Sequence, residues 1–204
     1  MLFYLTKQTI ERFGIRLPEA LKPKEKAAAE ALIEKEAEDP LLVWGGKLFY
    51  QQGKKYLQLV NPATKLTVIL PDLKKKGMED LSWTLGRYLM ALFEGEWETR
   101  AAIRRMFENS PGQAFAALKD RSAISTLNHI QMYLLDDPAF IREKAEPGEQ
   151  LPALGAARWI NEQYLFTFVE NGKTGYDYSS ERFRDLVLAR FGTPGGAPHL
   201  TIVK

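Results

Sequence analysis

The sequence contains no cysteine. This absence excludes disulfide bonds, zinc sites built on thiolates and cysteine nucleophiles. It is typical of proteins kept in a reducing compartment, and we therefore expect a cytoplasmic location.

Long apolar runs and a charge imbalance are absent as well. The opening run, MLFYL, is too short for the core of a signal peptide, and no segment reaches the roughly 18 apolar residues of a membrane span. The 28 basic and 26 acidic side chains leave a net charge of +2, which provides no argument for a nucleic-acid partner. We expect a soluble protein that has no membrane partner.

The spacings that hold cofactors or metals are also missing. The glycine pairs Gly45-Gly46 and Gly195-Gly196 stand outside any phosphate-loop or dinucleotide-binding pattern, so we interpret them as turn residues. The two histidines, His129 and His199, belong to no metal-binding motif. We predict no cofactor, no metal ion and no catalytic residue.

The clearest pattern that is present runs from Trp44 to Leu70. Alternating apolar residues predict strands at 43–51, 54–60 and 65–70. Gly53 marks the first turn between them, and NPAT, which contains Asn61, marks the second. These three strands are predicted to form an antiparallel meander with one apolar face and a second face that is apolar only in part.

Helical patterns flank the meander along the chain. A strand at 2–5 and two helices precede it, and helices at 78–93, 96–108, 112–119 and 121–135 follow. Next come a linker-like stretch, REKAEPGEQLPALGA, a hairpin that turns at Asn171-Gly172, and a last helix that ends at Gly192.

This order predicts a single α+β domain over residues 1–192. Its antiparallel sheet, made of the meander and the late hairpin, is predicted to be packed on one side by helices that include 78–93 and 121–135. Residues 193–204 are predicted to form a C-terminal tail or an edge strand.

The helix at 121–135 carries a polar stripe beside its apolar one. Arg121, Ser125, Asn128 and Met132 are spaced so that they share a face, and Asp120 is placed to cap the helix. Two interpretations remain open. The polar groups tie the helix to a loop or sheet edge by hydrogen bonds, or they line a pocket for a small anion or for the backbone of a partner protein.

The same segment resembles a mainly bacterial family that is classed as a domain of unknown function. The family pattern R-S-V-L-G-S-M-N-D is similar to the sequence here at Arg121, Ser122 and Asn128, with Leu127 a near equivalent, whereas Ser125 and His129 replace its glycine and aspartate.

Two further patterns of that family occur in the same order along the chain. The pattern W-H-A-N, followed by V-N-x-x-T, is matched at Trp44, Val60, Asn61, Thr64 and Val68, while Gly45 and Lys47 replace the histidine and the asparagine. The pattern L-N-x-x-P is matched at Asn161, with Tyr164 in place of proline. The resemblance implies one continuous domain in which Trp44, Asn61, Arg121, Asn128 and Asn161 are structurally linked. It implies no activity.

The leading functional hypothesis is a non-catalytic, cytoplasmic binding or regulatory protein, because no catalytic signature accompanies this polar set. Its candidate binding or scaffold residues are Trp44, Asn61, Arg121, Ser122, Asn128 and Asn161. One alternative is a hydrolase or nucleic-acid-processing enzyme whose carboxylates hold a divalent cation. The other is a homodimer formed through Trp97, Ile103, Met106 and Phe107.

Nucleic acid is the less favoured partner. The lysine clusters at 54–55 and 74–76 and the aromatic residues Phe49, Tyr50 and Tyr56 resemble those of single-strand binders. The same residues are more often found in the core and at the edges of sheets.

Overall fold

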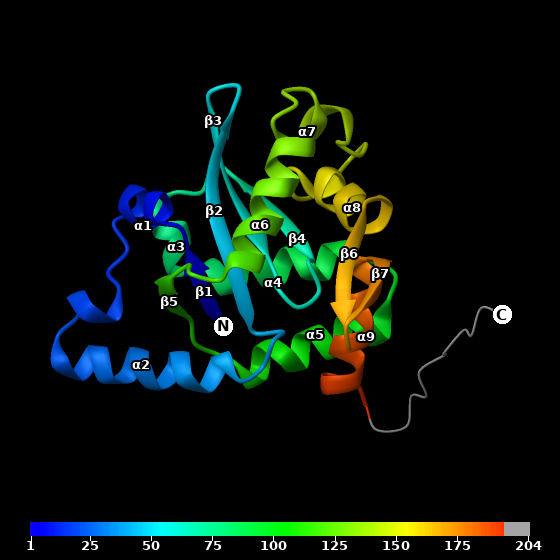
Figure 1. Cartoon of the computed structure of the whole chain (residues 1–204). Coiled ribbons are helices and arrows are strands. Elements are labelled where there is room, and N and C mark those ends of the chain that lie inside the picture. The colour runs from blue at the N-terminus through cyan, green and yellow to red at the C-terminus, as the bar shows by residue number, and fades with distance from the viewer. Residues whose placement is uncertain (194–204) are drawn as a thin grey trace.

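We describe a computed structural model in which residues 1–193 are placed; residues 194–204, and with them nearly all of the predicted tail or edge strand, lie outside the described part. Within residues 1–193 the chain forms an α+β domain with a five-stranded sheet and a separate two-stranded hairpin (Figure 1). No helix within residues 1–193 is long and apolar enough to cross a membrane.

The main sheet has the strand order β4-β3-β2-β1-β5. Its meander consists of β2 (Val43–Gln51), β3 (Lys54–Val60) and β4 (Thr67–Pro71), paired antiparallel as predicted. The first turn is tight because Gln52 and Gly53 adopt φ values of 50° and 73°, which match the twist of the flanking strands.

The prediction of a purely antiparallel sheet was wrong, because two short strands join the sheet in parallel. β1 (Leu2–Leu5) pairs in parallel with β2 on one side and with β5 (Ala114–Ala117) on the other. The segment at 112–119 was predicted to be a helix because alanine favours helices. Its backbone instead bonds to β1, and the Phe115 ring lies 5.9 Å from the Phe3 ring, so tertiary pairing overrides the local preference.

Eleven helical segments accompany these strands within residues 1–193. The first three are α1 (Lys7–Phe13), the 3-10 turn η1 (Pro18–Ala20) and α2 (Pro23–Ala37). The predicted helix at 78–93 is two helices, α3 (Lys75–Glu79) and α4 (Leu81–Leu92), and α5 (Trp97–Asn109) follows. The predicted helix at 121–135 is α6 (Arg121–Ile130), which continues as the π-helical turn η2 (Gln131–Leu135). The remaining helices are α7 (Phe140–Glu143), α8 (Leu154–Gln163) and α9 (Ser179–Phe191).

Helices cover both faces of the sheet, which corrects the prediction that 78–93 and 121–135 lie on the same side. One face packs against α4, α5 and α9, with Trp44, Leu57 and Leu59 contributing from the strands. The other face packs against α6, η2 and α8, with Phe49, Tyr56 and Ile69 contributing. Figure 1 shows α6 crossing in front of β2 while α4 lies behind the sheet. Helices lie on both faces because β3 and β4 carry apolar residues on both faces of the sheet, and each face has to be buried.

The late hairpin has the predicted turn but does not join the main sheet. β6 (Leu165–Glu170) and β7 (Lys173–Tyr178) pair antiparallel with each other around Asn171 and Gly172, both of which have positive φ. Phe166 and Phe168 on its inner face extend the core that lies under α6 and α8.

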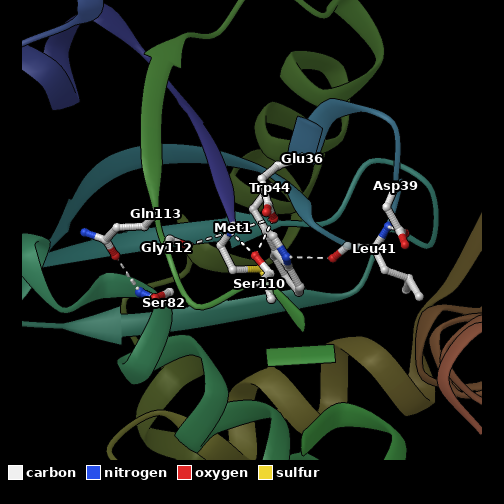
Figure 2. A network of polar contacts seen from close by, with 9 residues as sticks. All are labelled: Met1, Glu36, Asp39, Leu41, Trp44, Ser82, Ser110, Gly112 and Gln113. Atoms are coloured by element: carbon white, nitrogen blue, oxygen red, sulfur yellow. Dashed lines mark hydrogen bonds and ion pairs between the residues drawn. The ribbon is translucent and has the colours of Figure 1, made fainter. Parts of the chain in front are cut away.

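The start of β1 is held by a buried polar network (Figure 2). The Met1 ammonium group donates to Glu36 Oε2 at 2.8 Å, to Ser110 Oγ at 2.5 Å and to the Gly112 carbonyl at 2.7 Å. Met1 and Glu36 are fully buried. This network joins β1 to α2 and to the segment between α5 and β5. Burial lowers the pKa of the Met1 ammonium from its ordinary value of 8.0, and the hydrogen bond that the ammonium donates to Glu36 opposes that shift.

We predict that Glu36→Gln lowers the free energy of unfolding by about 3–5 kcal/mol at neutral pH, because it leaves a buried ammonium group without its countercharge. Without Glu36 the folded-state pKa of that group falls further below 8.0. The unfolded state then binds more protons between the two pKa values, so the variant should regain stability as the pH rises toward 8.

The measurement is urea unfolding of both proteins at several pH values. Glu38→Gln is the matched control, because Glu38 lies two residues further along and is exposed; it should change stability by less than about 0.5 kcal/mol. Equal effects of the two substitutions would contradict the prediction.

Candidate functional site

The predicted site residues do not form one cluster. Trp44, Asn61 and Asn161 are buried, with exposed fractions of 0%, 0% and 1%. Arg121, Ser122 and Asn128 are exposed along α6. The buried three act within the fold, and the exposed three face solvent.

Trp44 and Asn61 fix the chain where it enters the meander. Trp44 Nε1 donates to the Leu41 carbonyl at 3.2 Å, as Figure 2 shows. Asn61 Nδ2 donates to the carbonyls of Pro40 and Val43, at 2.8 and 3.0 Å. Because the Asn61 amide oxygen also accepts two hydrogen bonds from Thr64, one side chain closes the β3–β4 turn and holds the start of β2.

Asn161 joins three elements that are distant in sequence. Its Oδ1 accepts from Thr67 N and from Ser179 Oγ, both at 2.8 Å, and its Nδ2 donates to the Thr67 carbonyl at 2.8 Å. The Asn161 side chain therefore makes the hydrogen bonds with the Thr67 backbone that a neighbouring strand would otherwise make. It also links α8 to α9. These bonds satisfy a buried amide that would be costly to leave unpaired.

On α6 the structure shows an exposed polar face that includes Arg121 and Ser122. Asp120 caps the helix as predicted, accepting from Ser122 N at 2.7 Å and from Ala123 N at 3.3 Å. Within residues 1–193 the side chains of Arg121 and Ser122 have no hydrogen bond or ion pair. Asn128 Oδ1 accepts from Lys47 Nζ of β2 at 2.6 Å, which supports the interpretation that this stripe ties the helix to the sheet.

Lys47 belongs to the W-H-A-N pattern and Asn128 to the R-S-V-L-G-S-M-N-D pattern. The fold therefore brings these two sequence patterns into contact. Burial lowers the pKa of Lys47 from its ordinary value, and the nearby carboxylate of Asp136 opposes that shift.

A first hollow of about 570 Å³ lies beside the start of α6. Its apolar walls come from the sheet, α2 and η1, and its polar groups are Glu19, Glu30, Lys119 and Asp120. Carboxylates therefore do line a cleft next to Arg121. Within residues 1–193, however, no three His, Asp or Glu side chains lie close enough together to hold a metal ion.

The larger hollow is a groove of about 710 Å³ between α4, α5 and the loop 146–151. Its volume is that of a small-molecule site. The floor is apolar, formed by Met90, Ile103, Phe107, Leu151 and Leu154. The two helices approach closely because Gly86 has no side chain; a Cβ there would lie 3.3 Å from the Phe107 ring.

The loop that closes this groove is fixed by hydrogen bonds. Glu149 folds back on the start of α8, accepting from Ala153 N at 3.2 Å and from Gly155 N at 3.0 Å. The Tyr88 hydroxyl of α4 donates to the Pro152 carbonyl at 2.8 Å, and burial raises the pKa of that hydroxyl. This wall is therefore built before any ligand arrives.

The charges around the groove are not equally engaged. Glu149 accepts the backbone hydrogen bonds that fix the loop, and Glu146 pairs with Arg158 at 3.4 Å. Arg87 stacks on the exposed Trp83 ring at 4.9 Å. Arg100 keeps its Nε buried without a hydrogen-bond partner in the described part of the chain, and Arg104 likewise has no ion pair there. The α5 side of the groove thus offers guanidinium groups to an incoming anion, while the exposed carboxylates of Glu94 and Glu108 lie among the lining residues.

The sequence did contain a signal for this groove. On α5, Arg100, Ile103, Arg104 and Phe107 follow a helical spacing and form a mixed apolar and cationic stripe. Two residues of this stripe, Ile103 and Phe107, also belong to the dimer surface considered above. Ile103 and Met106 are fully buried, so of the four residues proposed for a dimer only Trp97, 73% exposed, lies openly at the surface.

Comparison with protein families matches residues 2–182 to a family described as Domain of unknown function (DUF6933). The chain belongs to this family. The match spans nearly all of the described domain and confirms the resemblance seen in the sequence. A search of the curated proteins finds no match.

We predict that the two motif asparagines differ sharply when each is changed to alanine. Asn161→Ala should lower the free energy of unfolding by about 2–4 kcal/mol, because it leaves the Thr67 N–H and C=O buried without partners. Asn128→Ala should cost less than about 1 kcal/mol, since its one bond is at the surface. Urea unfolding followed by tryptophan fluorescence measures both losses, and similar losses for the two variants would contradict the prediction.

Proposed function

We propose that this domain is a non-catalytic binding protein whose recognition site is the groove between α4 and α5, and that its ligand is an organic anion with an apolar body. The observation that carries the proposal is the combination of an apolar floor with Arg100, whose Nε is buried and unpartnered in the described chain.

The chemistry of the groove supports that ligand class. An apolar ligand body would cover Met90, Ile103 and Phe107, and its burial would supply most of the binding free energy. A carboxylate or sulfonate would give Arg100 the partner that it lacks, and a charge-assisted hydrogen bond of this kind contributes about 1.5–3 kcal/mol. Because the loop is already fixed, little conformational entropy has to be lost when a ligand binds.

The other functional interpretations have less support. The carboxylate-based hydrolase or nucleic-acid-processing alternative rests on the hollow beside α6, where no metal-binding group is assembled within residues 1–193. A cytoplasmic location remains part of the proposal, because a chain without cysteine suits a reducing compartment.

The test is a fluorescence titration with anilinonaphthalene sulfonate, an aromatic anion, on the wild type and on two arginine variants. Arg100→Gln should weaken binding roughly 10-fold to 100-fold, in line with the loss of one charge-assisted hydrogen bond. Arg121→Gln is the matched control, because Arg121 is exposed on the opposite face of the sheet; its affinity should stay within about twofold of the wild type. A phenylalkanoate should displace the probe at lower concentration than the matched phenylalkanol.

Two outcomes would reject the proposal. In one, Arg100→Gln binds the probe as tightly as the wild type while remaining folded. In the other, the neutral alcohol competes as well as the carboxylate, which would show that the groove has no preference for an anion.

A further inference from the structure

The hairpin β6–β7 is a two-stranded sheet whose two edges differ. The β6 edge faces the rest of the molecule, where Lys65 Nζ contacts Thr126 Oγ1 of α6 at 3.2 Å and lies 5.5 Å from the Phe168 ring centroid. β7 lies on the outer side, away from the main sheet (Figure 1). Residues 173–176 of β7 are all exposed, and no further strand pairs with β7 within residues 1–193.

Within residues 1–193, the outer edge of β7 presents backbone groups that no further strand pairs. The two-residue turn closes on the pair Glu170–Lys173, and antiparallel pairing alternates along the hairpin from that pair. Lys173, Gly175 and Asp177 therefore direct their N–H and C=O groups to β6. Those of Thr174 and Tyr176 point outward, as a strand edge does when it is ready to accept another strand.

The outer face of the hairpin is apolar as well. Leu165, Val169 and Tyr176 are 51%, 70% and 72% exposed, and the register places all three on the same face. A two-stranded sheet is marginal by itself, and additional strands both stabilise it and extend its faces.

We propose that the partner of this edge is the β7 strand of a second copy of the chain, paired antiparallel about a twofold axis at Gly175. In that register Lys173 stands opposite Asp177 of the partner subunit, and Asp177 stands opposite Lys173 of the partner subunit. The twofold axis therefore creates two cross-strand charge pairs from one sequence, each of which adds a lysine to the ion pair that Asp177 makes with Arg182 at 3.7 Å within its own chain. The edge is thus complementary to itself.

The other groups on the edge fit the same register. Thr174 meets Tyr176 of the partner subunit, so the outward backbone groups of both residues form the hydrogen-bonded pairs of the new ladder. Gly175 meets itself at the axis, where side chains approach most closely. A Cβ at Gly175 would have no atom within 4 Å in the single copy, so this position is open to a neighbour. Moving the register by two residues would place Asp177 opposite glycine and remove both charge pairs.

The first test is the solution mass as a function of concentration, measured by light scattering. The wild type should move from 23.2 kDa toward twice that mass. Lys173→Glu places two acidic groups opposite each other and should raise the dissociation constant at least 10-fold. The double variant Lys173→Glu with Asp177→Lys reverses both pairs and should recover the wild-type constant within about threefold. Lys54→Glu, on the other hairpin, is the matched control and should leave the mass unchanged.

A second variant keeps the proposal testable if the double variant does not fold. Because the chain has no cysteine, Gly175→Cys introduces a single thiol at the twofold axis, within disulfide distance of its symmetry mate. Mild oxidation at low protein concentration should yield a covalent dimer, whereas Lys54→Cys should not. A wild type that stays at 23.2 kDa at every concentration overturns the proposal. Equal crosslinking of the two cysteine variants, or a folded double variant that fails to regain the dimer, overturns it as well.

Discussion

The placement of β1 between β2 and β5 is the constraint on which the rest of this structure depends. Only four residues long, β1 bonds to a strand on each side, so it must be buried from its first residue onward. That burial brings the Met1 ammonium group into the interior, where its loss of hydration is costly. Glu36, Ser110 and Gly112 offset this cost with acceptors that arrive from two other parts of the chain.

Much of the fold could be predicted from local patterns, because the elements concerned are determined by neighbouring residues. The meander and the late hairpin have turn residues whose backbone preferences define a tight reversal, such as Gln52-Gly53 and Asn171-Gly172. The cap at Asp120 depends only on Ser122 and Ala123, two and three residues further along. These features need no information from distant parts of the chain.

The features that could not be predicted depend on pairs far apart in sequence. β5 is a strand only because Leu2–Leu5 lies beside it, and its alanines alone favour a helix. The assignment of α4 and α6 to opposite faces depends on both faces of β3 being buried, which an isolated helix pattern cannot reveal. The candidate groove could not be predicted for the same reason, because its lining comes from three separate segments of the chain.

The motif residues illustrate how a sequence pattern can point to importance without pointing to a site. Asn61 and Asn161 are buried amides that use their oxygen and nitrogen atoms to replace missing backbone partners. The need for these hydrogen bonds restricts which residue can occupy the position as strongly as contact with a ligand would. Arg100 belonged to no motif, and its interest comes from a buried Nε that has no hydrogen-bond partner among residues 1–193, which only the coordinates reveal.

The position of β1 between β2 and β5 also sets an order of assembly as the chain is synthesised. The meander pairs strands that are close in sequence, and it is complete once Pro71 is available. Leu2 has to wait for Ala114, a contact of long sequence separation that closes slowly. Until β5 emerges, the nascent chain carries β1 with one open edge, which is the kind of exposed strand that chaperones protect from aggregation.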